Sequence, residues 1–346
     1  MDLWILSEDF TPLGIVDTFS SAIWANRYRQ CGDFEIYAPA SIELLTLLRA
    51  DCFVVRRDDD MVGIIEKIKI DTDEENGDYI TVSGRCTRSI LARRIVWDQT
   101  ALNDTAENIM RQLVTDAFIS PTIAARKYDK LALGTVHGWT GRVRAQYTGD
   151  NILEAYEAMC TSKNYGFNVP LKDNMLVVEL YKPTDRSVNQ DENPHVVFSE
   201  QYDNLIATTY TMDKTEAKNV ALVAGEGEGS ARRRATCNLT PTPTGLHRRE
   251  IYVDARDVSS NEGEIAEITY TLMLSERGEE ALGEKPVIQS FEGTVEPLQM
   301  YTYKQDYFLG DIVTVCNKYG IQSDAQVVEV VEVWDESGYR CTPTFG

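Results

Sequence analysis

The stretch "AGEGEGSARRR" (224–234) combines alternating glycines with three arginines, the residue types that bind phosphate in glycine-rich loops. A P-loop needs Gly-x-x-x-x-Gly-Lys-Ser/Thr between a strand and a helix, and a dinucleotide-binding loop needs a glycine at position 230, where Ser230 stands. No helical pattern follows, and the two glutamates between the glycines would repel a phosphate. The sequence therefore argues against a nucleotide site here.

We instead expect this stretch to form a bend. Apolar runs predict strands at 219–225 and 249–256, and the glycine-rich residues would lie in a long, irregular hairpin that joins them. Gly225, Gly227 and Gly229 would supply unusual backbone angles and allow close packing of the chain.

The charged residues around this bend have two interpretations each. Arg232, Arg233 and Arg234 contact an acidic neighbouring subunit or lie in water. Asp254 and Arg256 are two residues apart on one strand, so they face the same side and could pair across a subunit boundary. The alternative, which we favour slightly, is a surface salt bridge worth about 0–1 kcal/mol.

The other polar residues form no recognisable catalytic or metal-binding pattern. No histidine has a Cys, His or carboxylate at metal-ligand spacing, and no Gly-x-Ser-x-Gly motif is present. The acidic loop 71–79 lacks the glycine and glutamate that a calcium-binding EF-hand requires, so we interpret it as a hairpin tip. We assign no catalytic, cofactor-binding or metal-binding residue. The three histidines are His137, His195 and His247.

Seven cysteines are scattered along the chain without a Cys-x-x-Cys pair. The odd number and irregular spacing favour reduced side chains in or near the core over a disulfide framework or a zinc site. The cysteines are Cys31, Cys52, Cys86, Cys160, Cys237, Cys316 and Cys341.

Length and charge restrict the class of protein. A chain of 346 residues predicts two or three domains, and 43% hydrophobic residues are enough for a globular core. The net charge of −21 disfavours binding to nucleic acid or to anionic membranes. The N-terminus does not resemble a signal peptide, and no apolar run approaches the roughly 20 residues of a membrane span. We expect a protein that is made in a cytoplasm and is initially soluble there.

Strands dominate both ends of the chain. In the first part we expect a helix at 41–50, with Ser41 as its N-cap. The strands expected there are 34–39, 52–56, 61–70 and 79–84. The strands expected in the last part are 205–213, 219–225, 249–256, 290–297, 311–317, 325–335 and 339–345, with a helix at 261–282.

The middle of the chain has a different pattern. A helix at 104–118 would open with Asp104 as N-cap and Glu107 completing a capping box. A second helix at 151–163 would stop at Gly166. Two strands, 166–169 and 175–180, follow, and 182–195 looks like a polar linker.

A weak internal repeat relates the two ends. Residues 52–84 read as strand, turn, long strand, acidic turn and closing strand, and residues 311–345 repeat this plan. Each is preceded by a short element containing Phe-Glu, "DFEIYAP" and "SFEGTVEP". Similar β-meanders arise by chance, and the alternative is two related small β-barrels.

The fold class that follows is α+β, mainly antiparallel β, with two small β-barrel domains in one chain and an α+β insert. The expected domains are a first barrel at 1–95, an α+β domain at 96–195 and a second barrel with a helical insertion at 196–346.

Several segments together resemble a family of phage tail-hub proteins, the siphophage Gp-thirty-seven-like type. The segment from "NVALVAGEGEGSARRR" to "GLHRREIYVDARDV" is similar to its signature, which here includes Arg249. Further resemblance lies in "CGDFEIYAP", in "ITVSGRCTRSILARRIV" (80–96) and in "YKQDYFLGDIVTV" (303–315). The motif residues of the last segment are Asp306, Tyr307, Leu309, Gly310 and Asp311.

The resemblance implies a structural role at the tip of a virion tail. Such hubs are homotrimers in which each chain carries two barrels, so that six barrels form a ring under the sixfold tail tube. It implies a distal tail protein and the tail tube above, a fibre or tip protein below, DNA only in transit, no membrane contact, and assembly in the cytoplasm of a bacterial host. Larger relatives append a fibre, a lysin or a carbohydrate-binding region after the barrels; because the sequence ends right after the second meander, we expect such a region to lie on another polypeptide.

The expected function is therefore non-enzymatic: a hub that joins the tail tube to the tip and gates the passage of DNA. The alternatives are a cell-wall-degrading enzyme, for which no catalytic constellation is visible, and a carbohydrate- or receptor-binding module. From the net charge we expect an acidic channel that repels DNA and lets it slide.

Overall fold

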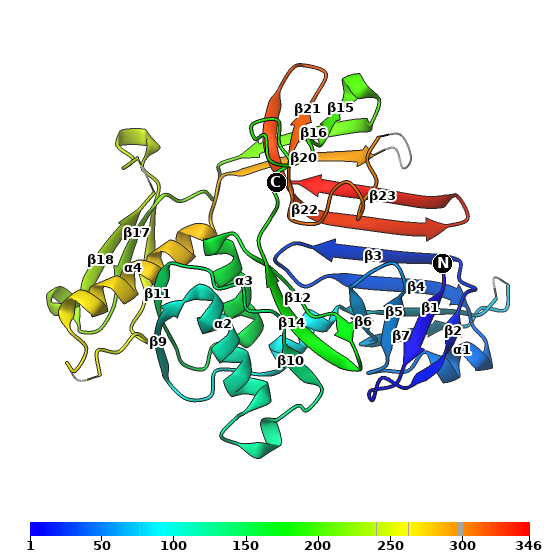
Figure 1. Cartoon of the computed structure of the whole chain (residues 1–346), viewed down its shortest axis with the longest axis horizontal. Coiled ribbons are helices and arrows are strands. Elements are labelled where there is room, and N and C mark those ends of the chain that lie inside the picture. The colour runs from blue at the N-terminus through cyan, green and yellow to red at the C-terminus, as the bar shows by residue number, and fades with distance from the viewer. Residues whose placement is uncertain (76, 240, 262, 296–299) are drawn as a thin grey trace.

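Both ends of the chain enter one large sheet, and two further units lie beside it (Figure 1). The computed structural model describes residues 1–75, 77–239, 241–261, 263–295 and 300–346. The structure is mixed α+β with mainly antiparallel strands. Within the described residues, no helix is both long enough and apolar enough to cross a membrane.

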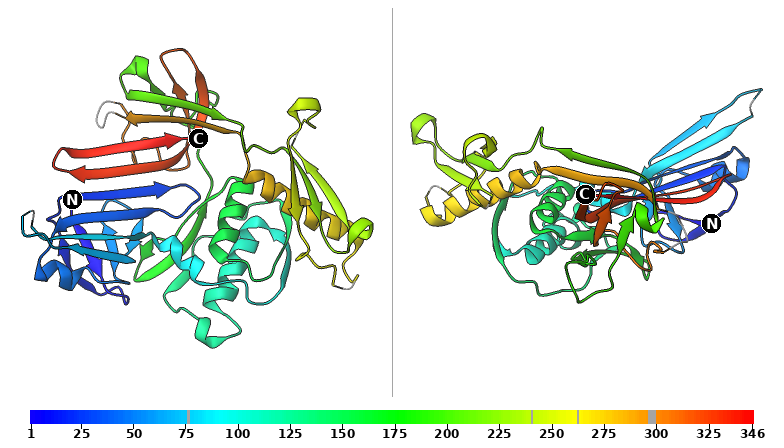
Figure 2. Two further views of the ribbon diagram at one scale, coloured as in Figure 1. Left: turned by 180° about the vertical axis from the view of Figure 1, so that it is seen from behind. Right: turned by 90° about the horizontal axis from the view of Figure 1, so that it is seen from above.

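The large sheet contains ten strands among the described residues, eight of them in one continuous path. In chain order they are β3 (Ser21–Arg27), β4 (Asp33–Pro39), β7 (Lys67–Asp71), β8 (Tyr79–Arg85), β16 (Leu205–Asp213), β20 (Ile288–Val295), β22 (Gln322–Asp335) and β23 (Gly338–Phe345). Their spatial order is β16-β20-β23-β22-β3-β4-β8-β7. Segments some 300 residues apart in sequence therefore lie side by side (Figures 1 and 2).

One strand order occurs in both halves of this sheet. Within each half the first strand pairs with the second, the second with the fourth, and the fourth with the third, as β3-β4-β8-β7 and β16-β20-β23-β22. The third and fourth strands of each half come from the two meanders that the sequence comparison aligned. Over the residues that the structure describes, the sheet path is open and closes into no barrel.

A smaller sheet shares its core with the N-terminal half of the large one. Its order is β2-β1-β5-β6. The elements are β1 (Leu3–Leu6), β2 (Pro12–Val16), α1 (Ile42–Leu47), β5 (Phe53–Arg56) and β6 (Val62–Ile64). Ser41 caps α1 as expected, because its hydroxyl accepts a hydrogen bond from Leu44 N at 3.1 Å.

The single long strand expected at 61–70 is wrong. The chain crosses there from one sheet to the other, so β6 pairs with β5 while β7 pairs with β8. The crossing lies between Ile65, whose N–H bonds Cys52 O at 2.9 Å, and Glu66, whose N–H bonds Ser83 O at 3.1 Å. Valine and isoleucine recur on both sides of the crossing, from Val62 to Ile70, so the β-strand preference of these residues alone could not locate it.

The middle unit packs two helices against short strands. Its helical elements are η1 (Thr87–Arg93), α2 (Ala106–Val114), the π-helical turn η2 (Thr115–Ile119), η3 (Ala124–Arg126) and α3 (Ile152–Lys163). Its strands are β9 (Thr100–Thr105), β10 (Leu131–Leu133), β11 (Arg142–Tyr147), β12 (Gly166–Asn168), β13 (Leu171–Lys172) and β14 (Met175–Tyr181). Tyr156 Oη donates to Met110 O at 2.6 Å, which ties α3 to α2 inside the core.

The predicted ends of these two helices need correction. Thr105, not Asp104, is the N-cap of α2, because β9 continues to residue 105. Glu107 does not form a capping box; it is buried and accepts hydrogen bonds from the backbone of a neighbouring loop. Asn164, in the left-handed conformation at φ 53°, ends α3 before Gly166 is reached.

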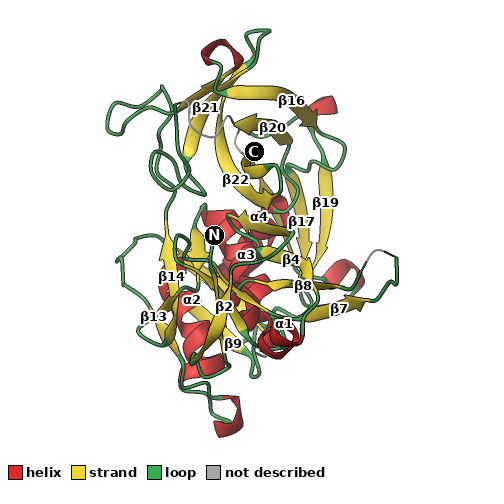
Figure 3. Cartoon of the chain, turned by 90° about the vertical axis from the view of Figure 1, so that its right-hand side faces the viewer, coloured by secondary structure: helices red, strands yellow, loops and turns green. Residues whose placement is uncertain are grey.

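The third unit projects from one end of the molecule (Figure 2). Its elements are β17 (Val220–Ala224), η5 (Gly229–Ala231), β18 (Arg234–Asn238), η6 (Gly245–His247), β19 (Glu250–Asp254) and α4 (Glu267–Gly283). The helix α4 covers a three-stranded sheet ordered β18-β17-β19 (Figure 3). Helix and sheet together enclose a hydrophobic core that is separate from the other cores of the chain.

The hairpin expected between 219–225 and 249–256 is wrong. β17 and β19 are parallel, and β18 is the strand that forms the hairpin with β17. The sequence of β18, "RATCN", has too few apolar residues to reveal a strand. The expected helix at 261–282 begins later, at Glu267, and both residue 262 within it and residues 296–297 of the expected strand at 290–297 lie outside the described residues.

Candidate functional site

The two ends of the chain are joined by strand pairing. β22 and β3 run antiparallel over seven residue pairs, from Arg27 opposite Glu329 to Ser21 opposite Asp335. At one end of this ladder Arg27 Nε donates to Glu329 Oε1 at 2.7 Å. The junction makes one sheet out of two topologically similar halves, so we take it as the centre of the candidate site.

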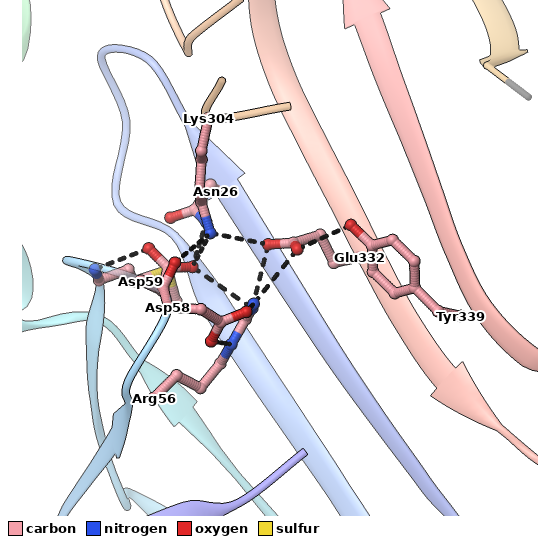
Figure 4. A network of polar contacts seen from close by, with 8 residues as sticks. Asn26, Arg56, Asp58, Asp59, Lys304, Glu332 and Tyr339 are labelled. Atoms are coloured by element: carbon pink, nitrogen blue, oxygen red, sulfur yellow. Dashed lines mark hydrogen bonds and ion pairs between the residues drawn. The ribbon is translucent and has the colours of Figure 1, made fainter. Parts of the chain in front are cut away.

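A buried arginine lies beneath this junction (Figure 4). Arg56, at the end of β5, is only 1% exposed. Its two Nη atoms contact the Glu332 carboxylate of β22 at 3.0 and 3.2 Å, and Nε and Nη2 contact Asp58 at 3.1 and 2.8 Å. One guanidinium therefore connects β5 of the smaller sheet to β22 of the large sheet with paired, charge-assisted hydrogen bonds.

A second cation completes the cluster. Lys304 Nζ lies 2.9 Å from Asp59 and 3.3 Å from Glu332. Asn26 donates to Asp59 at 3.1 Å, and Tyr339 donates to Glu332 at 3.0 Å (Figure 4). Each carboxylate in the cluster is thus held by at least one cation.

Aromatic rings cover the arginine on the apolar side. The Arg56 guanidinium carbon lies 4.3 Å from the ring centre of Trp334 and 5.5 Å from that of Trp24. Burial opposes the charge, but the hydrogen bonds to Asp58 and Glu332 outweigh it and raise the pKa of Arg56. Burial likewise acts against the Asp58 carboxylate, and the Arg56 hydrogen bond lowers the pKa of that group overall. Because every carboxylate in this cluster is paired with a cation, the cluster is better suited to holding the two sheets together than to transferring protons.

The family-like segment 306–311 lies on the C-terminal side of the junction. Asp311 is buried and accepts hydrogen bonds from Arg186 Nε at 2.7 Å, Phe308 N at 3.0 Å and Thr184 N at 3.3 Å. Two of these donors belong to the segment expected as a linker at 182–195. That segment is therefore fixed to β21 (Ile312–Cys316), the strand that pairs with β15 (Val197–Ser199).

Three other motif residues of this segment, Tyr307, Leu309 and Gly310, pack within the chain, whereas Asp306 is exposed. Tyr307 is buried with its ring centre 5.2 Å from that of Phe198, and Leu309 packs against the same core. Gly310 has φ 95°, and a Cβ there would overlap the Tyr28 ring of the N-terminal half. Glycine at position 310 thus allows the two ends of the chain to approach.

Asp311→Ala should lower the free energy of unfolding by about 2–3 kcal/mol, because it leaves three donors, one of them charged, without their buried acceptor. Asp306→Ala is the matched control: Asp306 is exposed and accepts from Thr302 N at 2.7 Å, so its loss should cost under about 1 kcal/mol. Chemical denaturation followed by fluorescence measures both values. Equal losses would contradict the role given to Asp311.

The glycine-rich stretch lies in the projecting unit, away from this junction (Figure 1). Gly225 follows β17, and a Cβ there would overlap Tyr270 Oη of α4. Gly227 has φ 97° and faces the backbone of residue 231, whereas Gly229 has φ 53° and open space around its Cα. Two of the three glycines therefore serve close packing within the chain.

The three arginines have partners inside their own unit. Arg232 pairs with Asp254 and donates to the carbonyls of residues 224 and 225. Arg233 lies 3.4 Å from Glu267 and over the Tyr270 ring, and Arg234 donates weakly to Gly229 O at 3.4 Å. The sequence left open whether residues 232–234 contact a neighbouring subunit or lie in water; in the structure all three arginines contact groups of their own chain.

Asp254 and Arg256 pair with each other at 2.6 Å on the surface of this unit. The hydrogen bonds from Arg256 and then Arg232 lower the pKa of Asp254 to about 2. Arg249 is exposed and donates to Lys214 O at 2.5 Å. Nothing in these contacts reaches the junction, so the motif residues form two separate groups.

Gly225→Ala should lower the free energy of unfolding by about 1–3 kcal/mol, since the new methyl group must displace Tyr270 and thereby the α4 helix. Gly229→Ala places the same methyl group in open space and should cost no more than about 1 kcal/mol, from its left-handed backbone. Thermal unfolding of both variants provides the comparison. A larger loss at position 229 would show that backbone angle, not packing, selects these glycines.

The buried cluster was missed by the sequence analysis. In the sequence, the acidic residues 58–60 are typical of a turn after the strand at 52–56, and Glu332 is one of several glutamates within the strand at 325–335. A signal did exist, because Glu332 has the same parity as Val330 and Trp334 and must therefore face the same side of the strand. Its cationic partners lie 276 and 28 residues away, which no local pattern reveals.

The metal and cofactor predictions remain predictions. The structure shows no group of three or more His, Cys, Asp or Glu side chains at metal-binding distance among the residues it describes. The acidic tip at 71–79 includes residue 76, which lies outside them.

Solved tail proteins, two of them described as prophage proteins, share this fold over nearly their whole lengths. The 43 kDa tail protein of prophage MuSo2 from Shewanella oneidensis superposes with a TM-score of 0.61 at 13% identity, covering 100% of this chain and 98% of that one. Prophage tail protein gp18 from Listeria monocytogenes gives 0.59 at 12%, with 99% and 94% covered. The tail protein from Neisseria meningitidis gives 0.59 at 12%, with 99% and 96% covered.

At these identities the structural likeness shows a common fold. No curated protein sequence matches the chain. The model of one protein family, described as Siphovirus ReqiPepy6 Gp37-like protein, matches residues 2–346. The resemblance stated from the sequence motifs is thereby confirmed. The chain belongs to the Siphovirus ReqiPepy6 Gp37-like family of phage tail proteins.

Proposed function

We propose that this protein is a non-enzymatic tail hub: three copies form a ring with six similar sheet units, which joins the tail tube to the tip of the tail. The observation that carries the proposal is the repeated strand order within one continuous sheet. Inside the chain, the third strand of the second half, β22, pairs with the first strand of the first half, β3.

Among the described residues, the eight-strand path ends at β7 on one side and at β16 on the other. β7 is the third strand of the first half, and β16 is the first strand of the second half. Pairing of β7 with β16 of the next copy would repeat the β22–β3 junction between molecules. Because this contact is head-to-tail, it closes into a ring when the rotation per copy is right. Three copies then give six pseudo-equivalent units.

The edge strand β7 has the features of an interface. All five of its residues are exposed, and among them Ile70 is 49% exposed. An exposed edge strand with apolar side chains is a template for pairing with another strand. β7 also lacks the proline that commonly protects such edges.

In the proposed assembly the distal tail protein and tail tube lie above the ring and a fibre or tip protein lies below. The ring would be part of the virion tail tip, assembled in the bacterial cytoplasm, and would gate the passage of DNA without contacting a membrane. The domains proposed for this assembly remain 1–95, 96–195 and 196–346, with each barrel completed by contacts within the ring.

The face of the sheet opposite the core would line the channel. In register, one row across this face reads Arg340, Val333, Ile23, Glu35, Ser83 and Lys67. The next row reads Thr342, Val331, Ala25, Asp33 and Arg85. Cations and anions alternate, so a channel lined by this face would be nearly neutral, in contrast to the acidic channel expected from the net charge.

Mass measurement in solution tests the proposal. Native mass spectrometry and negative-stain imaging over a range of micromolar concentrations should show a species of about 117 kDa, three times the 39.0 kDa chain, with a central opening. A monomer at every concentration that also released sugar or peptide from bacterial cell walls would favour the enzymatic alternative.

A further inference from the structure

Two cysteines far apart in sequence have adjacent sulfur atoms. Cys31 lies in the turn between β3 and β4, and Cys86 lies between β8 and η1, 55 residues later. Their Sγ atoms are 3.3 Å apart. Cys86 N also donates to Gly32 O at 2.8 Å, which continues the β4–β8 ladder and holds the two backbones side by side.

The surroundings favour a thiolate at this pair. Gly32 N donates to Cys86 Sγ at 3.2 Å, and the Arg88 guanidinium lies nearby. Burial disfavours a charge on Cys86, but the hydrogen bond from Cys31 and the attraction of Arg88 outweigh it and lower the pKa of Cys86. Cys86 is buried, whereas Cys31 is only half-buried and gives access from solvent.

We propose that Cys31 and Cys86 are a redox-sensitive dithiol that forms an intramolecular disulfide when the protein meets a peroxide. The chain needs no large movement, because the two sulfurs must approach by only about 1.2 Å to reach a bonding distance. Neither the assembly nor the tail-hub function is needed for this chemistry, so it can fail or succeed independently of the proposed function.

The reaction balances with hydrogen peroxide as the oxidant. The Cys86 thiolate attacks one peroxide oxygen, the O–O bond breaks, and Cys86 becomes a sulfenic acid while hydroxide leaves. The Cys31 sulfur then attacks Cys86 Sγ, the S–O bond breaks and water leaves. In total, two thiols and one peroxide give one disulfide and two waters; the cysteines lose two electrons and the peroxide gains them.

The disulfide would lock the turn on which the junction rests. Arg88 already donates to the carbonyls of Arg27 and Gln30 at 2.6 and 2.8 Å and so holds this turn against η1. Arg27, the last residue of β3 before this turn, pairs with Glu329 of β22. A disulfide at Cys31 would therefore add a covalent bond to the Arg88 contacts that hold this turn next to the β3–β22 ladder.

The test treats the folded, full-length protein with hydrogen peroxide and maps disulfides by mass spectrometry without reduction. We expect a loss of about 2 Da, one peptide pair joining Cys31 to Cys86, two fewer titratable thiols, and a thermal midpoint higher by on the order of 5 °C. Dithiothreitol should reverse all four changes.

Matched variants separate this pair from general oxidation. Cys31→Ser and Cys86→Ser should each abolish the 2 Da loss, whereas Cys52→Ser, at another buried cysteine, should retain it. Both serine variants must keep the unfolding midpoint of the untreated protein within a few degrees, which shows that they fold. Seven free thiols after treatment, or a linkage between other cysteines, would overturn the proposal.

Discussion

Arg56→Met should lower the free energy of unfolding by about 3–5 kcal/mol. This is the largest loss that we expect from substituting any single buried charged residue in this chain. The methionine fills a similar volume between Trp24 and Trp334 but leaves Glu332 buried with only Lys304 to balance it. The cost therefore comes from an uncompensated carboxylate rather than from a cavity.

The control for Arg56 is its neighbour. Arg57→Met removes the same charge from an exposed position and should change stability by under about 0.5 kcal/mol. A double variant, Arg56→Met with Glu332→Met, should recover much of the loss, since replacing both partners of a buried pair by apolar groups is often nearly neutral. If the double variant is as unstable as the single one, packing rather than charge explains the effect.

Ile70→Lys should raise the dissociation constant of the ring by about 100-fold without unfolding the monomer. Ile70 is 49% exposed on the edge strand β7, and in the proposed assembly its exposed part is covered by β16 of the next copy. An ammonium group placed there would lose its water without gaining a partner. Sedimentation velocity over a concentration series measures the change.

Ile42→Lys provides the comparison for this effect. Ile42 is 87% exposed on α1, which is not part of the large sheet, so its substitution should leave assembly unchanged. Circular dichroism of both variants shows whether the monomer remains folded. Equal assembly of the Ile70 variant and the unchanged protein would remove β7 from the proposed interface.

Local patterns predicted local elements well in this chain. β4 alternates buried Phe34 and Ile36 with exposed Glu35, and the Ser41 cap marks the start of α1. The same patterns failed to predict elements whose existence or boundaries depend on the neighbouring strand with which they pair. Isoleucine residues on both sides concealed the crossing from β6 to β7, and the polar strand β18 exists because β17 pairs with it.

The functional groups divide in the same way. Gly310 and Asp311 could be noticed in the sequence as turn residues, but their partners, Tyr28 and Arg186, lie more than 100 residues away. The pairing of Arg56 with Glu332 spans 276 residues. No spacing rule applies at such separations, because the two groups meet only after both sheets have formed.

The sequence by itself determined the class of fold, most of the strands, the repeated meander and the motifs by which the family is identified. The tertiary structure alone decided that the two repeats join through β3 and β22, that a buried ion cluster connects them, and that β7 and β16 are the end strands of the path formed by the described residues. The physical reason is that side-chain periodicity encodes which face of a strand is buried, whereas the choice of a neighbouring strand depends on contacts between residues far apart in the chain.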